Sequence, residues 1–411
     1  MTAKRKAQVA EIHKWEFKAR FRRHAFGWKS QPAITRIKQA VAEIKKVAKK
    51  EPVLAAEGAI AFLERVSPAL EHVDSSSGSI GTAVNNAIAE LVPTIANAPV
   101  DAKTREAWLA RLFDAYQDDG VPYIEWLGDH WGTLCASKEI ASAWADRLIE
   151  TVKLAWSPDP SLRGFFKGTT NCLSALVAAE RYDDALALLE LAPYKMWHYR
   201  QYGVKALAAK GKKAEAIRYA EEGRGLNDSP VAIARACEEV LLSSGLVDEA
   251  YRRYGLEANQ AGTYLATFRA VAKKYPHRTT SESLADLVKT TPGDEGKWFA
   301  AAKDAGLYDD ALALASRTPC DPKTLARAAR DFGEKEPAFA IGAGLLSLHW
   351  LVQGYGYEIT GADVWDAYRA TLAAAERHGS SAEVKVRIRK LVAAEQAGGF
   401  VTKVLGREFG L

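Results

Sequence analysis

The string Tyr-Asp-Asp-Ala-Leu-Ala-Leu occurs twice in this chain, at Tyr182–Leu188 and at Tyr308–Leu314, a separation of 126 residues. Two weaker copies, Glu215-Ala216 and Glu249-Ala250, lie between them. The central alanines of the four copies are 31, 34 and 61 residues apart, and the last gap equals two periods. A period in the low thirties is typical of two-helix units that bury their apolar faces against their neighbours. The sequence therefore predicts an all-α fold, an α-solenoid of helix-turn-helix repeats.

The residues before each alanine explain why a repeat turns. Three copies have glycine five residues earlier, at Gly211, Gly245 and Gly306, and glycine readily adopts the left-handed conformation that ends a helix. The acidic residues then lie in the first turn of the next helix, where unpaired N–H groups and the helix dipole favour negative charge. A small alanine lets the two helices approach closely. We therefore interpret the acidic pairs as helix-starting residues of a repeat and not as a metal or proton site.

The pattern resembles the second helix of the tetratricopeptide repeat, which begins with an acidic residue and an alanine and ends near a proline, here Pro193 and Pro319. The first helices lack the tryptophan and the leucine-glycine pair of that family. The fourth unit has lost its signature. We place the repeats at residues 163–194, 195–225, 226–258, 259–290 and 291–320.

The first 160 residues predict further helices without the Asp-Asp-Ala register, so this half is expected to be more irregular and HEAT-like. Helices are expected at about residues 102–116, 122–135 and 138–156, with Asp101 and Ser137 as N-caps. The predicted organisation is a basic aromatic arm (1–30), an irregular helical-repeat region (31–160), a tetratricopeptide-like solenoid (161–336) and a C-terminal helical cap (337–411).

Residues 337–357 contain no formal charge, which raises the question of a membrane span. Several glycines and polar residues interrupt the stretch, so we expect a buried solenoid helix that ends at Gly354, and no integral membrane segment. The four cysteines lie far apart in apolar helical contexts, which favours reduced core thiols in a cytoplasmic protein. The eight histidines have no metal-ligand spacing, and the sequence predicts neither a metal nor a cofactor.

Charge is distributed unevenly along the chain. The first 50 residues contain 15 Lys and Arg against three Glu, a net charge of +12, whereas the whole chain has +5, so the remainder has −7. Aromatic residues from Trp15 to Trp28 alternate with the cations, and stacking surfaces beside phosphate-pairing groups suit nucleic acid. The candidate nucleic-acid contacts are Lys14, Lys18, Arg20, Arg22, Arg23, Trp28, Lys29, Lys45 and Lys46.

Two other interpretations of this arm stay open. It can be an amphipathic segment that packs its aromatic side chains onto the solenoid and leaves its charges in water, as a structural cap. It can also lie on an anionic membrane surface, because basic aromatic helices bind lipid headgroups.

An unusually aromatic segment, residues 194–202, opens one predicted first helix. In a solenoid the first helices of successive units line the concave surface, and aromatic residues and arginine are common at binding hot spots. Tyr264 and Trp298 are expected on related faces of later units. The concave-face candidates for a protein or peptide partner are Trp197, Tyr199, Arg200 and Lys205.

Signals for catalysis are few, and we assign no catalytic residue. Asp129-His130-Trp131 beside Glu125 can form an acid–base cluster, as can Asp363 with Asp366. An acid next to tryptophan is also a feature of helical-repeat DNA glycosylases. Exposed helix charge beside a buried indole explains both clusters more simply.

Five segments, at residues 24–50, 70–93, 225–245, 291–306 and 355–365, resemble an uncharacterised bacterial family of helical-repeat proteins, some of them labelled SWIM zinc-finger proteins. A SWIM finger needs a Cys-x-Cys pair followed by Cys-x-His, and this sequence has neither. The resemblance implies a nucleic-acid setting without supplying site residues.

These observations together predict a non-catalytic binding scaffold. Its partner is expected to be a protein or peptide at the concave face, with nucleic acid as a possible partner of the basic arm. The alternatives are a repeat enzyme of the DNA glycosylase type and a pure protein–protein adaptor.

Overall fold

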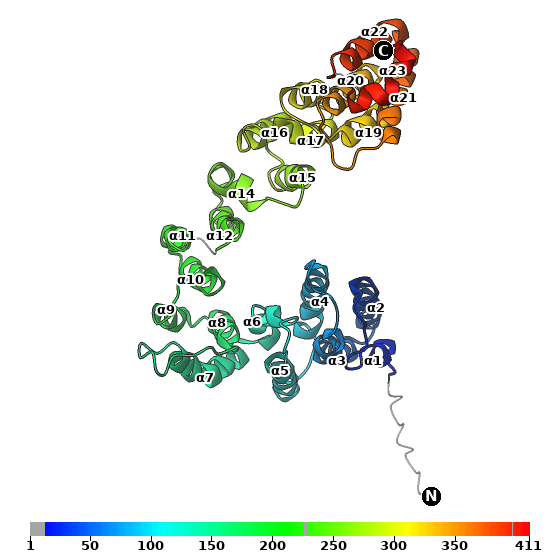
Figure 1. Cartoon of the computed structure of the whole chain (residues 1–411). Coiled ribbons are helices and arrows are strands. Elements are labelled where there is room, and N and C mark those ends of the chain that lie inside the picture. The colour runs from blue at the N-terminus through cyan, green and yellow to red at the C-terminus, as the bar shows by residue number, and fades with distance from the viewer. Residues whose placement is uncertain (1–12, 226–227, 397) are drawn as a thin grey trace, which may run out of the picture. The chain divides into compact units, whose positions relative to one another are not determined.

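The computed structural model describes residues 13–225, 228–396 and 398–411, and this part of the chain is helical with no strand. The chain divides into two compact units between Ser229 and Pro230 (Figure 1). This division does not test the domain boundaries expected at residues 30, 160 and 336, which stay predictions.

The first unit consists of helices joined mostly by short turns. Its elements are α1 (Glu16–Arg20), α2 (Ser30–Ala48), α3 (Pro52–Leu70), α4 (Ser79–Ala96), α5 (Ala102–Gln117), the 3-10 turn η1 (Glu125–Leu127), α6 (Trp131–Cys135), α7 (Lys138–Ala155), α8 (Thr169–Ala178), α9 (Tyr182–Glu190), α10 (Trp197–Ala209) and α11 (Lys213–Glu221).

The second unit continues in the same manner. Its elements are α12 (Pro230–Leu242), α13 (Val247–Ala250), a π-helical turn η2 (Tyr251–Gly255), α14 (Leu256–Ala258), α15 (Tyr264–Lys274), α16 (Thr280–Lys289), the 3-10 turn η3 (Glu295–Trp298), α17 (Phe299–Asp304), α18 (Tyr308–Arg317), α19 (Pro322–Phe332), α20 (Pro337–Val352), α21 (Gly361–His378), α22 (Ser381–Ala393) and α23 (Phe400–Phe409).

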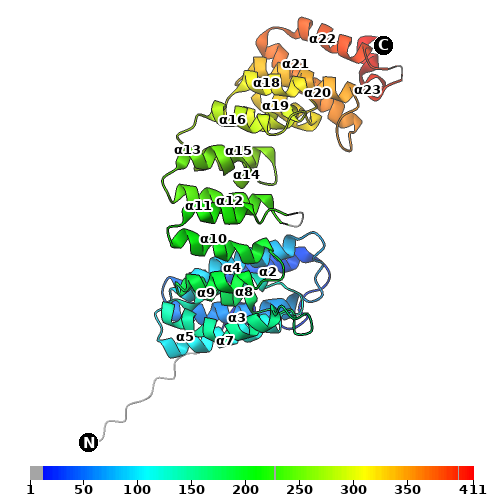
Figure 2. The same ribbon diagram turned by 90° about the vertical axis from the view of Figure 1, so that its left-hand side faces the viewer.

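Every predicted repeat contains a helix pair. In the first unit α8 packs against both α9 and α10, and α10 packs against α11, so that each hairpin covers the next (Figure 2). In the second unit α15 packs against α16 and α17, and α17 packs against α18. The predicted α-solenoid is confirmed, including the hairpin α15–α16 in the repeat that has lost the signature.

The turn inside a repeat has one backbone geometry. The predicted glycines have φ values of 78° at Gly211 and 74° at both Gly245 and Gly306. In each turn the following residue donates its N–H to the carbonyl five residues earlier, as Lys212 does to Leu207 at 3.0 Å. This is the hydrogen bond of a Schellman motif, which satisfies a carbonyl left over at the helix end. The three glycine-containing turns therefore share one turn chemistry.

The next helix begins as the sequence predicts. Acidic residues occupy the first turns of α9, α11, α13 and α18. The alanine after them has no exposed surface in any copy, which confirms its place in the core. The four alanines are Ala185, Ala216, Ala250 and Ala311.

In the irregular half, α5 and α7 confirm two expected helices, and Asp101 and Ser137 cap them by accepting hydrogen bonds from backbone N–H groups. The single helix expected at residues 122–135 is wrong, because η1 and α6 replace it. The Asp119 carboxylate accepts the N–H of Ile124 at 2.9 Å and so holds the bend that leads into this segment. Gly132 then lies so close to α8 that a Cβ there would be 2.5 Å from the carbonyl of Ser174.

The uncharged stretch forms α20, and Gly354 follows its end with a φ of 78°, as expected. This helix packs against α18, α19 and α21 in the second unit (Figure 2). Among the described residues, no helix combines the length and apolar character needed to cross a membrane.

Candidate functional site

The aromatic residues of the basic arm belong to the core of the first unit. Trp15, Phe17 and Phe21 are only 4%, 2% and 1% exposed. The rings of Phe17 and Phe21 both contact Phe62 of α3 edge-on, with centroids 5.8 and 5.1 Å away. The expectation that these rings offer stacking surfaces to nucleic acid is therefore wrong. The alternative in which they pack onto the solenoid describes this part of the arm, because α1 is too short to bury them on its own.

The cations of the arm remain at the surface, and so does one aromatic residue. All nine candidate nucleic-acid contacts are exposed, and Trp28 is 72% exposed. Some cations have acidic partners: Arg20 binds Glu16 at 3.2 Å and Lys45 binds Glu90 at 2.8 Å. Residues 1–12, with three further cations of the arm, lie outside the described residues. Nucleic-acid binding stays a prediction.

The candidate face on α10 is divided between core and surface. Lys205 is exposed, with its Nζ 5.0 Å from the centroid of the Tyr202 ring, and Trp197 and Tyr199 are half-buried. Arg200 is only 5% exposed, so its expected place on a ligand-facing surface is wrong. Its guanidinium lies 3.8 Å over the Tyr219 ring of α11.

The structure brings α10 together with the predicted acid–base cluster. Asp129 accepts hydrogen bonds from the Tyr202 hydroxyl at 2.8 Å and from the Gln201 side-chain amide at 3.1 Å. Its backbone carbonyl accepts the Ser174 hydroxyl of α8 at 3.0 Å. These contacts join the segment after η1 to two successive hairpins. They give Asp129 a structural role between repeats.

Aromatic and titratable side chains surround this junction. The Trp126 ring, 39% exposed, packs edge-on against His130, and Tyr199 packs edge-on against Trp156. Burial lowers the pKa of His130, partly opposed by the Asp129 carboxylate. We call Trp126, Asp129, Trp197, Tyr199 and Lys205 the α10 face.

The second predicted acidic cluster has a structural role at one of its two residues. Asp363 is the N3 residue of a capping box at the start of α21, where its carboxylate accepts the N–H of Thr360 at 2.7 Å. Asp366, three residues later, is exposed. The carboxylate of Asp363 is therefore engaged by the helix start, in agreement with the simpler explanation that the sequence favours.

Sequence reasoning missed a cavity of about 520 Å³ in the second unit. It lies between the π-helical turn η2 and the start of α15. Tyr264 and Trp298, which were expected on related faces, meet edge-on here with ring centroids 4.8 Å apart. Two aromatic residues of neighbouring first helices were the only signal in the sequence. The irregular turn that completes the cavity has no recognisable motif.

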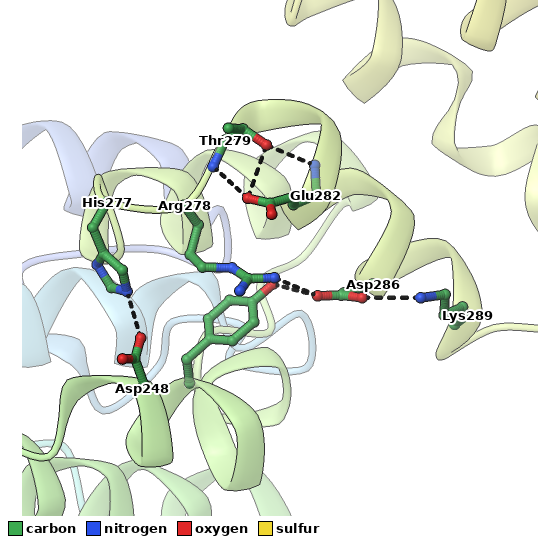
Figure 3. A network of polar contacts seen from close by, with 8 residues as sticks. Asp248, His277, Arg278, Thr279, Glu282, Asp286 and Lys289 are labelled. Carbon is green, nitrogen blue, oxygen red and sulfur yellow. Dashed lines mark hydrogen bonds and ion pairs between the residues drawn. The ribbon is translucent and has the colours of Figure 1, made fainter.

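A polar network beside this cavity joins α13 and η2 to α16 (Figure 3). Asp248 lies 3.2 Å from the Nε2 of His277, and Asp286 accepts the Tyr251 hydroxyl at 3.1 Å. Arg278 donates to the same Asp286 carboxylate at 3.2 Å. The network holds neighbouring helix pairs in register. Among the described residues no group of three His, Cys, Asp or Glu side chains is arranged to hold a metal ion.

Comparison with known proteins does not assign this chain to a family. No family model matches the chain, and no curated protein matches it. Among solved structures, the chain is similar to one described as the crystal structure of the APC/C hetero-tetramer Cut9-Hcn1. The two share 13% identity over 91% of this chain and 81% of that chain, with a TM-score of 0.23. A similarity at this level carries no inference, so the fold assignment rests on the helix pairs themselves, and the resemblance to a bacterial family stays a prediction.

Proposed function

We propose that this chain is a helical-repeat binding scaffold whose protein or peptide partner lies against the α10 face. The observation that supports this most is the exposure of Lys205 and Trp126, together with half-buried Trp197 and Tyr199 on the helix that Asp129 binds through Gln201 and Tyr202. Large aromatic groups held by packing lose little entropy on binding, which is why they dominate interface energies.

The surroundings of this face support the same function. Tyr194 and Met196, just before α10, are 67% and 44% exposed. Apolar side chains grouped on a surface favour a partner because binding removes them from water. The chain therefore carries a mixed aromatic, apolar and basic surface at the start of one first helix.

Site-specific photo-crosslinking in the native cell tests the proposal. A benzoylphenylalanine at position 197 or 205 is expected to capture the same partner, identified by mass spectrometry. The matched control is the same group at the exposed Lys103 of α5. Capture of that partner equally well from position 103, or of nothing from positions 197 and 205, would contradict the proposal.

A second function, nucleic-acid binding by the first unit, is supported by the position of Trp28. This 72% exposed ring is followed directly by the exposed Lys29 and α2, whose Lys45 and Lys46 are also exposed. A base stacked on the ring, with phosphates near the lysines, matches the way single strands are bound without sequence preference.

A further inference from the structure

The cavity of the second unit owes its shape to the π-helical turn. The Tyr275 ring packs so closely on Gly255 that a Cβ there would be 3.0 Å from it. The Gly255 carbonyl accepts the Asn259 side-chain amide at 2.7 Å. That amide also donates to Glu238, a carboxylate with no exposed surface, at 2.7 Å. A wide turn held by buried side chains is a structural feature that recurs at functional sites.

The floor of the cavity is aromatic and apolar. Tyr254 and Trp298 are only 3% and 2% exposed, and Tyr264 and Leu287 complete the lining beneath the rim. The Trp298 N–H donates to the Thr291 hydroxyl at 2.8 Å, which fixes the orientation of the indole ring. The volume of about 520 Å³ lies within the usual range for ligand pockets. An aromatic group entering it would meet the rings edge-on, a favoured arrangement.

The cavity is lined by charged side chains of both signs, the cations Arg252 and Arg253 and the acid Glu257. The guanidinium of Arg252 is exposed and makes no hydrogen bond or ion pair with any residue that the structure describes. Two neighbouring acids are engaged elsewhere: Asp248 contacts His277 (Figure 3), and Glu249 binds Arg253 at 3.0 Å. The first turn of α15, whose Thr263 caps the helix, borders the same rim and adds the positive end of a helix dipole.

We propose that this cavity binds a peptide segment in which an aromatic side chain lies next to an acidic one. The aromatic ring enters between Tyr254, Tyr264 and Trp298, and the carboxylate pairs with Arg252. The inference rests on the proposed scaffold function and assigns a second binding site to it, in a different unit from the α10 face.

Calorimetric titration of the full chain with blocked decapeptides tests this. The probes have a Gly-Ser background and a central Phe-Glu, Glu-Phe, Phe-Lys or Ala-Glu pair. The peptide with adjacent Phe and Glu, in one of the two orders, is expected to bind at least about tenfold more tightly than the Phe-Lys and Ala-Glu peptides, as the removal of one ion pair or ring contact implies. Equal binding of all four, or no binding, would overturn the proposal.

Variants assign the binding to the cavity. Arg252→Glu is expected to reverse the preference between Phe-Glu and Phe-Lys, whereas Arg389→Glu on the exposed surface of α22 keeps the wild-type order. Filling the rim by Ala261→Trp, or by Gln260→Trp if the first variant unfolds, is expected to abolish binding. Both replaced residues are exposed. Unchanged binding by Arg252→Glu or by a folded rim variant would place the peptide elsewhere.

One further titration separates two sources of the same chemistry. If N-acetylphenylalaninate binds as tightly as the peptide, the cavity is a small-molecule site and the peptide proposal is wrong. Failure of the peptide titrations with crosslinking intact at positions 197 and 205 would remove this site and leave the scaffold function standing.

Discussion

Glu180 has the conformation that glycine has in the other three repeat turns. Its φ is 59°, and the following N–H, of Arg181, donates to the Leu176 carbonyl at 2.9 Å as in the Schellman motif of the other turns. A side chain in this left-handed region costs roughly 1–2 kcal/mol. Replacement by glycine removes this strain. It also makes the unfolded chain more flexible, which lowers the free energy of unfolding by roughly 0.5–1 kcal/mol.

We therefore expect Glu180→Gly to raise the free energy of unfolding by up to about 1 kcal/mol in chemical denaturation. Glu180→Gln is the matched control, because it keeps the strain and removes the exposed ion pair with Lys138 (2.6 Å), which is worth little. The reverse change Gly211→Glu should destabilise the protein. A glycine variant less stable than the glutamine variant would contradict this account.

His130 gives the first unit a pH dependence. Its Nε2 is buried without a hydrogen-bond partner among the described residues, and burial lowers its pKa. The unfolded chain then takes up a proton near pH 6.5 that the folded chain resists. Stability contributed by the neutral ring is thus complete above pH 6.5 and is lost as the pH falls towards the folded-state pKa.

Denaturation midpoints at pH 7.5 and 5.5 measure this effect. The loss of stability on acidification is expected to be smaller in His130→Gln than in the wild type. Gln201→Ala removes a hydrogen bond to the adjoining Asp129 without removing a titrating group, and it should keep the wild-type dependence. An equal loss in wild type and His130→Gln would show that the histidine is not responsible.

Residue types that act through the local backbone could be predicted from the sequence. Gly211 and Asp101 act within one turn, and both are where the pattern places them. Arg200 could not be placed correctly, because its burial depends on Tyr219, which lies 19 residues later on another helix. The same applies to Phe17, whose partner Phe62 belongs to α3. An amphipathic pattern in a short segment does not show against which part of the protein its apolar side packs.

Among the elements, α12 carries the buried carboxylate that organises the second unit. Glu238 accepts hydrogen bonds from the Tyr275 hydroxyl at 2.5 Å, the Lys274 ammonium at 2.6 Å and the Asn259 amide at 2.7 Å. The helix pattern in the sequence predicts α12. It does not predict that the acid at a core position of this helix accepts hydrogen bonds from three donors later in the chain. For this reason the π-helical turn and its cavity could not be predicted.

Glu238→Gln removes the negative charge that pairs with Lys274. It also places an amide N–H₂, which can only donate, next to groups that themselves donate. We expect it to lower the free energy of unfolding by about 3 kcal/mol, the usual cost of breaking a buried pair. Glu239→Gln, at the exposed neighbouring position on α12, is the control and should change stability by less than about 0.5 kcal/mol. Similar unfolding midpoints for the two variants would show that the network contributes little.

On the scale of the whole molecule, charge separates the first 50 residues, with +12, from the rest of the chain, with −7. A surface of this kind attracts polyanions in a manner that salt weakens, because each phosphate that pairs with a cation releases condensed counterions. The acidic remainder opposes binding elsewhere on the chain. The charge pattern therefore predicts a localised interaction with nucleic acid and not a general affinity spread over all repeats.

Fluorescence anisotropy with labelled 20-nucleotide single strands measures this interaction. The dissociation constant is expected to rise by at least about tenfold between 50 and 200 mM salt, and Lys29→Glu with Lys46→Glu should flatten that dependence by about 0.7 in logarithmic slope for each phosphate that the variant no longer neutralises. The control is the double variant Lys103→Glu with Lys213→Glu, which changes the net charge by the same amount and should bind as the wild type does.

Trp28→Ala is expected to weaken binding by about 1–3 kcal/mol, the value of one stacked base. Equal weakening by both double variants would mean that net charge alone, and not this surface, determines the affinity.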